Sequence, residues 1–353
     1  MKFKGLFIFL FMLIFILQEA KTAEQSIFNN PQAVFIEGNF TKVSDVLWAS
    51  PKGFDLTMDI YTPNSGKASY PVIVIFHGGG WLINNKSIMN EAAAYLASKG
   101  EYVVCNVNYR LLPDQDNTVK INEIIEDVFG AVLWIKENIS KYKGNPAKIA
   151  VTGDSAGGHL AIMVVLQGHN LSSKGFAGTN LGFNPSYLPK GKTAEKIAKK
   201  NGLAVQAAMI SYGAFDLYAS ALGGFEKESN IFWNLAKAKA RGMFGEGVNA
   251  NTHPDHYKQI SPVYLIPKAS ERKLPPMLFT VGSKDQLTTP ASIETFISKL
   301  KEAGHTNIEY WVHEGRPHAF LDSGSNEFLG ISFAKDAPPA LDKMLAFLNK
   351  IFY

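Results

Sequence analysis

Ser155 is the residue of this sequence with the clearest potential for chemistry. It lies between Gly153 and Gly157 in the segment KIAVTGDSAGGHLA. The apolar residues before it predict a buried strand, and those after it predict a helix. A strand that turns directly into a helix strains the corner residue and exposes its side chain, and the flanking glycines leave room for the turn. The pattern predicts a serine nucleophile, and a chance match in a glycine-rich loop is the alternative.

A run of three glycines follows the apolar strand PVIVIF, in the segment HGGGW of residues 77–81. Such a run costs chain entropy, which makes sense where the backbone must come close to another group. Backbone N–H groups in such a loop can stabilise the negative charge that develops on a carbonyl oxygen under attack. We expect Gly79, Gly80 and Ala156 to donate the N–H groups of this oxyanion hole. A flexible loop or a phosphate cradle is the alternative, but no G-K-[ST] motif follows.

A nucleophilic serine needs a base to take its proton and an acid to orient that base. In strand-to-helix corners of this type the chain order is serine, then acid, then histidine. His318 lies in the turn EGRPHAF, just past the last predicted strand NIEYWVHEG, and is the predicted base. His313 is still inside that strand and His305 ends the preceding helix, so we expect both to be packed or surface histidines.

Two aspartates compete for the role of the acid. Asp285 follows the strand-like segment LFTVGSKD, and Asp216 follows the strand before it, in SYGAFDLY. We favour Asp285, because its strand is adjacent to the one that leads to His318 and the carboxylate needs only a short reach. Asp216 is expected to brace a loop. Asp154 is too close to Ser155 along the chain for this role, and we expect it to tie the corner to a neighbouring loop.

Composition bounds the class of protein. The chain has 353 residues, 46% hydrophobic and 19% charged, which is typical of a folded protein with a large core. A net charge of +4 without a long basic run argues against a nucleic-acid partner. His253 and His256 in HPDH could suggest a zinc site. No further ligands stand at the spacing of a zinc site, so we expect a surface role for both histidines. We expect no metal or organic cofactor. The single cysteine, Cys105, is expected to be a buried thiol.

The first 23 residues predict a secretory signal peptide. Two lysines in MKFKG precede an apolar run from Leu6 to Leu17 that is short for a membrane span. Cleavage is expected after Ala20 or Ala23, which leaves a secreted or periplasmic protein without a membrane anchor. An uncleaved anchor is the alternative.

The order of elements after residue 24 predicts an α/β fold. Strand-like and helix-like segments alternate, which indicates one domain with a mostly parallel sheet and helices on both faces. The chemistry is then expected at the carboxyl ends of the strands. Two excursions, at about residues 168–201 and 218–274, interrupt the alternation, and we expect them to cover the site in part.

Together the motifs HGGGW, NYRL, GDSAGGHLA, GSKD and EGRPHAF resemble an α/β-hydrolase of the HGGG class related to hormone-sensitive lipase. Within that class the chain is similar to bacterial carbohydrate esterases that remove acetyl or feruloyl groups from xylan. The resemblance implies a Ser155–His318–Asp285 triad that acts on a small-molecule or polysaccharide ester. Exposed aromatic residues could stack on a sugar or ferulate ring, although a place in the core is the alternative: Trp81, Tyr212, Phe215, Phe232 and Trp233.

Other functions stay open on the sequence alone. A formamidase, a lipase or a peptidase would use the same triad, since acyl transfer from amides needs the same parts. A hydrolase-like binding protein without catalysis is a further alternative, but every expected catalytic position holds a competent residue. The sequence does not indicate the acyl group, the alcohol or the oligomeric state.

Overall fold

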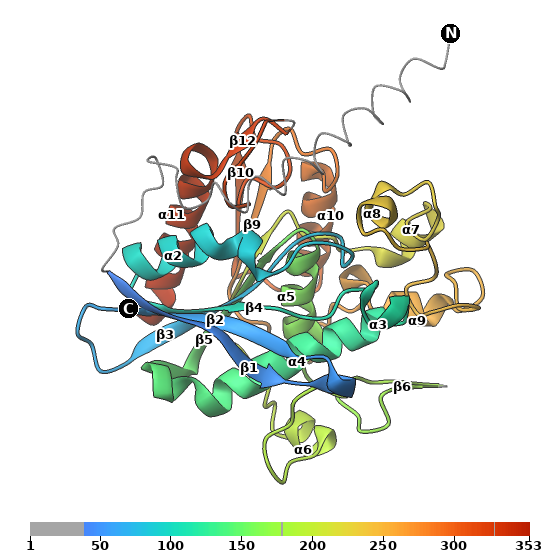
Figure 1. Cartoon of the computed structure of the whole chain (residues 1–353), viewed down its shortest axis with the longest axis horizontal. Coiled ribbons are helices and arrows are strands. Elements are labelled where there is room, and N and C mark those ends of the chain that lie inside the picture. Colours follow the sequence, from blue (N-terminus) through green and yellow to red (C-terminus); the bar gives the residue numbers. More distant parts are fainter. Residues whose placement is uncertain (1–38, 178, 328) are drawn as a thin grey trace.

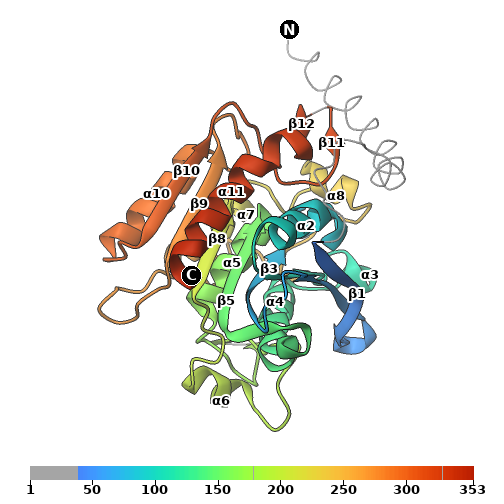
Figure 2. The ribbon, with the colours of Figure 1, turned by 90° about the vertical axis from the view of Figure 1, so that its left-hand side faces the viewer.

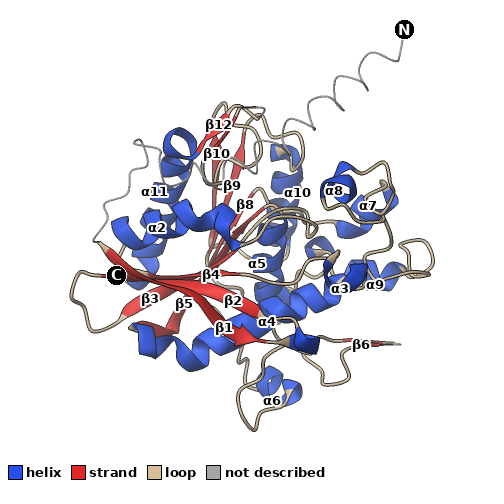
Figure 3. Ribbon diagram, in the orientation of Figure 1, coloured by secondary structure: helices blue, strands red, loops and turns tan. Residues whose placement is uncertain are grey.

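A single eight-stranded sheet forms the centre of the protein (Figures 1 and 3). The computed structural model describes residues 39–177, 179–327 and 329–353, so the predicted signal peptide lies outside the described residues. The strand order is β1-β2-β4-β3-β5-β8-β9-β10. The pairs β1–β2 and β2–β4 are antiparallel and all other pairs are parallel, which confirms the predicted mostly parallel sheet. The strands are β1 (Phe40–Ala49), β2 (Leu56–Pro63), β3 (Tyr70–Phe76), β4 (Val103–Val107), β5 (Gly144–Asp154), β8 (Ala207–Ser211), β9 (Met277–Gly282) and β10 (Ile308–His313).

The central strands β3, β4, β8 and β9 are buried along their whole length because both faces of the sheet are covered. All seven residues of β3 are buried, as its continuous run YPVIVIF predicts for a strand inside a parallel sheet. The edge strand β1 is mostly exposed. Phe76 at the end of β3 pairs with Gly153 near the end of β5, which brings the glycine loop and Ser155 to the same edge of the sheet.

Helices cover both faces of the sheet. Figures 1 and 3 show α2 on one side of β1–β4 and α4 on the other, while α2 also contacts α11 and α4 contacts α5. In Figure 2, β9 and β10 run between α10 and α11. The helices are α2 (Asn90–Lys99), α3 (Asp114–Asn117), α4 (Ile121–Asn138), α5 (Ala156–Gln167), α6 (Ala194–Lys199), α7 (Leu217–Leu222), α8 (Ile231–Leu235), α9 (Pro254–Gln259), α10 (Pro290–Glu302) and α11 (Phe333–Phe352).

The last helix is longer than its sequence predicts. A helix is expected only around ALDKMLAFLNKIFY, yet α11 begins at Phe333 and contains Pro338 and Pro339. Proline lacks an N–H and normally stops or kinks a helix, so contacts from outside must hold the first turn. Asp336 supplies them, because its carboxylate pairs with Arg316 at 2.8 Å and its carbonyl oxygen lies 2.8 Å from His313 Nε2.

The two excursions lie against different parts of the fold. The first contains α6 and a small hairpin of β6 (Phe176–Ala177) and β7 (Asn180–Leu181), and it packs on α4, where Ser186 N donates to the carbonyl oxygen of Glu126 at 3.0 Å. The second carries α7, α8 and α9 and reaches the glycine loop, as described below. A second small hairpin joins β11 (Ser325–Asn326) and β12 (Ile331–Ser332). Within the described residues, none of the helices has the length and apolar character needed to cross a membrane.

Candidate active site

Ser155 sits at a strained corner between β5 and α5. Its backbone lies in the left-handed region, with φ 50° and ψ −116°, at the N-cap of α5. The strain is held by backbone hydrogen bonds on both sides: Ser155 N donates to Ser211 O at 3.0 Å, and His159 N donates to Ser155 O at 3.1 Å. A strained residue at a strand-to-helix corner presents its hydroxyl at the sheet edge, as the sequence predicts.

The glycines that flank Ser155 are required by packing. A Cβ at Gly157 would overlap the carbonyl oxygen of Phe76, and a Cβ at Gly153 would overlap that of Gly157. The helix α5 therefore begins in direct backbone contact with the end of β3. This contact holds Ser155 next to the loop that follows β3.

The glycine loop folds back on itself beside the corner. Gly79 and Gly80 have φ of 120° and 61°, and Gly79 O accepts hydrogen bonds from Leu82 N at 3.1 Å and Ile83 N at 3.0 Å. Among the described residues, no partner accepts a hydrogen bond from the N–H groups of Gly79 and Gly80. Ala156 is the first residue of α5, where an N–H has no acceptor within the helix. These three N–H groups are thus free for a ligand oxygen.

Asp154 ties the corner to the loop, as expected. Its carboxylate is buried against Gly78, where an added Cβ would overlap it. Burial raises the pKa of Asp154 to about 6, and the charge on His318 and the Gly78 N–H oppose that rise. Asp154 therefore lies between the corner at Ser155 and the glycine loop.

His318 and Asp285 form a hydrogen-bonded pair. His318 Nδ1 donates to Asp285 Oδ2 at 2.7 Å, and Asp285 Oδ1 accepts from the N–H groups of Leu287 and Thr288, each at 2.9 Å. Asp285 is buried, which by itself would raise the pKa of its carboxyl group. The hydrogen bond and charge of His318 outweigh burial and hold that pKa below its usual value. The structure therefore brings together the acid and the base that the sequence predicts.

The register of the sheet brings this pair to the serine. Asp154 on β5 pairs with Ser211 on β8, and Ser211 pairs with Thr280 on β9, so these strands end at one level. Tyr212 follows Ser211 directly, and its ring lies 4.7 Å from that of His318 at 62°. Ser211 O accepts the hydrogen bond from Ser155 N, and Tyr212 packs on His318. This dipeptide therefore contacts both the serine and the histidine of the site.

The rival residues lie elsewhere. Asp216 caps α7, where its Oδ1 accepts from Ala219 N at 2.9 Å. His305 Nε2 lies 2.8 Å from Pro267 O, and His313 Nε2 lies 2.8 Å from Asp336 O, so each is engaged with backbone. Each of these placements agrees with the sequence-based choice of Asp285 and His318.

The two histidines of HPDH lie without a cluster of further metal-binding side chains in the described ranges. His253 and His256 lie at the start of α9 with ring centroids 5.3 Å apart. Across residues 39–353, apart from 178 and 328, there is no group of three or more His, Cys, Asp or Glu side chains that could hold a metal ion.

Four of the five aromatic residues that could stack on a substrate ring are buried, Trp233 among them at 1% exposed, which agrees with the alternative of a place in the core. Trp81, Tyr212 and Phe215 are 4%, 0% and 6% exposed. Phe215 stacks on Phe296 of α10 with ring centroids 4.0 Å apart, so it belongs to the core. Tyr212 packs on His318, and Trp81 points into the protein. Phe225 of the second excursion packs on Trp81 with ring centroids 5.6 Å apart, and the sequence pattern does not reveal that packing.

Thr288 escaped sequence reasoning, whereas Phe232 is among the aromatic residues that the sequence singles out. Thr288 Oγ1 lies 3.1 Å from Asp285 Oδ2 and 3.2 Å from His318 Nδ1. Phe232 on α8 is half-buried and covers Gly80, where a Cβ would lie 3.3 Å from its ring. No motif marks Thr288. The second excursion therefore forms part of the wall beside the free N–H groups, whereas the first packs on α4.

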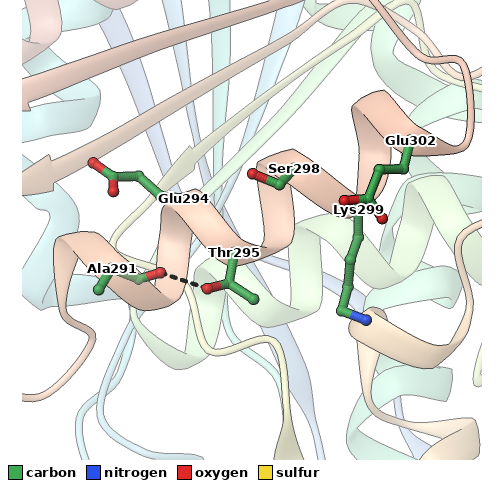
Figure 4. Close-up of a pocket in the computed structure, with 6 residues that line it drawn as sticks. All are labelled: Ala291, Glu294, Thr295, Ser298, Lys299 and Glu302. Atoms are coloured by element: carbon green, nitrogen blue, oxygen red, sulfur yellow. Dashed lines mark hydrogen bonds between the residues drawn. The ribbon is translucent and has the colours of Figure 1, made fainter.

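A surface hollow on α10 is separate from this site. It has a volume of about 440 Å³ and includes none of the residues described above (Figure 4). Its lining comes from one exposed helix face: Ala291, Glu294, Thr295, Ser298, Lys299 and Glu302.

Buried histidines predict a loss of stability in acid. Burial lowers the pKa of His77 and of His159 to about 4, against about 6.5 in an unfolded chain. Between these values the unfolded chain binds more protons than the folded one, so the free energy of unfolding falls as the pH falls from about 6.5 to 4. Each histidine contributes about 1.4 kcal/mol per pH unit. The free energy of unfolding, measured with urea at pH 7, 6 and 5, should therefore depend less on pH in His159→Asn, by about that amount per pH unit. Equal pH dependence in the parent and the variant would contradict the lowered pKa of His159.

The fold and the corner at Ser155 define the protein as an α/β-hydrolase. The apo form of esterase 2 from Thermogutta terrifontis superposes with a TM-score of 0.62 at 22% identity, over 89% of this chain and 95% of that one. Its propionate-bound form gives 0.60 at 20% identity, over 92% and 97%. A family model described as BD-FAE matches residues 58–300, and the chain belongs to the BD-FAE family.

Curated relatives carry esterase names. Esterase LipQ of Mycobacterium tuberculosis is 24% identical over 275 residues, which are 75% of this chain and 56% of LipQ. Carboxylesterase NlhH of the same species is 33% identical over 110 residues, which are 31% of this chain and 33% of NlhH. The matches thus span between a third and just over half of the length of these relatives.

Proposed function

We propose that this protein is a serine esterase that hydrolyses carboxylic esters through Ser155, His318 and Asp285. The observation that carries the proposal is the 2.7 Å hydrogen bond from His318 Nδ1 to the buried carboxylate of Asp285, at the sheet edge where Ser155 lies. Membership of the BD-FAE family and the esterase names of the relatives support it.

The hydrogen bond to Asp285 defines the chemistry of His318. Because Nδ1 carries a proton and donates a hydrogen bond to Asp285, Nε2 is the nitrogen that can accept a proton from Ser155 Oγ. Oγ then forms a bond to the ester carbonyl carbon, and the carbonyl π electrons move onto oxygen. The N–H groups of Gly79, Gly80 and Ala156 stabilise that negative charge.

The second half of the cycle restores the serine. The intermediate collapses, the carbon–oxygen bond to the alcohol breaks, and His318 gives its proton to the leaving oxygen. A water molecule, deprotonated by His318, attacks the acyl-enzyme and releases the carboxylic acid, while the proton returns to Ser155 Oγ. These steps use side chains and backbone groups of this chain and water.

For the substrate, we favour acetyl or feruloyl esters of a plant polysaccharide such as xylan. The resemblance to the HGGG class and to carbohydrate esterases supports this choice, as does export through the signal peptide predicted at residues 1–23. Small acyl esters are the second candidate. The name carboxylesterase on a relative and the propionate bound to a protein of the same fold favour them.

Product analysis tests both candidates. The mature protein is incubated with acetylated xylan, feruloylated xylan and an aryl acetate, and released acetate and ferulate are quantified. Release of acetate or ferulate from xylan would support the polysaccharide substrate. Cleavage of the aryl acetate alone would indicate a general esterase instead. Activity only on amides would contradict the ester assignment. A fluorophosphonate probe, followed by peptide mass analysis, should modify Ser155.

Replacing Phe232 with alanine should broaden the acyl preference. The ring covers Gly80 beside the proposed oxyanion donors, and its removal opens space there. We expect the ratio of kcat/KM for a hexanoyl ester to that for an acetyl ester to rise about tenfold, the effect typical of hydrophobic pocket contacts. Asn234→Ala, at an exposed position on the same helix, is the control. An unchanged ratio would show that Phe232 does not border the acyl site.

A further inference from the structure

Trp81 connects the glycine loop to the interior of the protein. It directly follows Gly80, has a left-handed φ of 61°, and is 4% exposed. Its indole Nε1–H donates to His159 Nδ1 at 3.2 Å, and the two rings meet edge to face with centroids 5.2 Å apart. A bulky residue with positive φ is strained, so these side-chain contacts hold a backbone conformation that Trp81 would not otherwise prefer.

His159 lies on the nucleophile's helix and is fully buried. It is four residues from Ser155, whose carbonyl oxygen accepts its backbone N–H. On the far side of the imidazole, Nε2 lies 2.9 Å from the carbonyl oxygen of Ile260, in the second excursion. The side chain therefore joins three segments: the glycine loop, α5 and the excursion that carries Phe232.

The partners of His159 determine its tautomer. An indole N–H can only donate and a carbonyl oxygen can only accept. Nδ1 must therefore be the unprotonated acceptor from Trp81, and Nε2 must carry the proton that is donated to Ile260. Only the neutral imidazole satisfies both, which agrees with the lowered pKa that burial produces. The groups that set this pKa are the buried surroundings and the Ile260 carbonyl; no charged side chain among the described residues contributes.

We propose that His159 is a positioning residue, which, through its hydrogen bond to Trp81, fixes the N–H groups of Gly79 and Gly80 relative to Ser155. The inference rests on the proposed function. Gly80 directly precedes Trp81, and the left-handed φ values of Gly79 and Gly80 leave the direction of their N–H groups to the contacts of the neighbouring residues. The bond from Trp81 to α5 ties this loop to the same helix whose first turn presents Ser155 and Ala156.

A matched pair of variants separates the hydrogen bond from packing. Asparagine and leucine have similar shapes, but the Oδ1 atom of an asparagine introduced here can accept from Trp81 near the position of Nδ1, and leucine cannot. We expect His159→Leu to lower kcat for an aryl acetate about 10- to 100-fold with KM nearly unchanged, since small misplacement of transition-state groups has effects of that size. His159→Asn should stay within about threefold of the parent.

Trp81→Phe tests the other end of the bond. It keeps an aromatic ring and removes the donor, so it should lower kcat by the same factor as His159→Leu. The double variant should lose no more than either single variant, because both remove one interaction. Binding of a trifluoromethyl ketone, which forms a hemiketal anion on the serine, should weaken in parallel. A stability change alone would not move this inhibitor constant.

The outcomes separate the two proposals. If Ser155→Ala abolishes activity while folded Trp81→Phe keeps the parental kcat, the role of His159 is wrong and the proposed function stands. If Ser155→Ala stays active, the proposed function fails. Equal losses in His159→Asn and His159→Leu would also overturn the inference. Should the variants not fold, nitrogen NMR of the parent protein decides: the inference requires an unprotonated Nδ1 and a protonated Nε2 at His159, and the reverse tautomer contradicts it.

Discussion

Replacing Ser155 with alanine is expected to lower kcat for an aryl acetate by about 10⁴-fold or more. The variant has no oxygen that can attack the carbonyl carbon, so only binding and the oxyanion hole remain to accelerate the reaction with water. The corner keeps its geometry, because its hydrogen bonds from Ser155 N to Ser211 O and from His159 N to Ser155 O are made by backbone. The thermal unfolding temperature should therefore change little.

A control serine makes this result specific. Ser298 is exposed on α10 and lines the hollow of Figure 4, so Ser298→Ala should keep the parental kcat. The fluorophosphonate probe should label Ser298→Ala and fail to label Ser155→Ala. Substantial turnover by a folded Ser155→Ala variant would exclude Ser155 as the nucleophile.

The placement of the candidate site residues was predictable from the sequence because it follows from local rules. The strand-to-helix turn at Ser155 requires glycines that can be read in one short segment. The order of the chain then places an acid and a histidine after later strands, and the structure brings Asp285 and His318 within 2.7 Å. The sheet was predictable for the same reason, since a continuous apolar run such as β3 is typical of a strand covered on both faces.

The surroundings of the site depend on tertiary packing and were not predictable. Trp81, Tyr212 and Phe215 have residue types that could bind a ligand, yet each is buried. The covering helices of the second excursion, α7, α8 and α9, have only five or six residues each, too few to show a clear periodicity. The sequence therefore identified the candidate residues of the site, but it did not show which aromatic residues border the space around them.

Replacing Asp285 with asparagine should lower kcat by about 10³- to 10⁴-fold. An asparagine amide that donates to His318 Nδ1 would stabilise the tautomer with the proton on Nε2, which cannot accept a proton from Ser155. In the parent, burial alone would raise the pKa of Asp285, but the hydrogen bond and charge of His318 hold it below its usual value. The carboxylate thus stays ionised at neutral pH and accepts a hydrogen bond from the Nδ1–H group.

The rival carboxylate supplies the control for this prediction. Asp216→Asn keeps an oxygen that can accept from Ala219 N at the start of α7, and it should leave kcat within about twofold of the parent. Steady-state assays of both variants at pH 7 make the comparison. If Asp216→Asn caused the larger loss, the acid would be misassigned. If neither variant lost activity, the hydrogen bond to His318 would not be needed for turnover, and the proposed triad would reduce to Ser155 and His318.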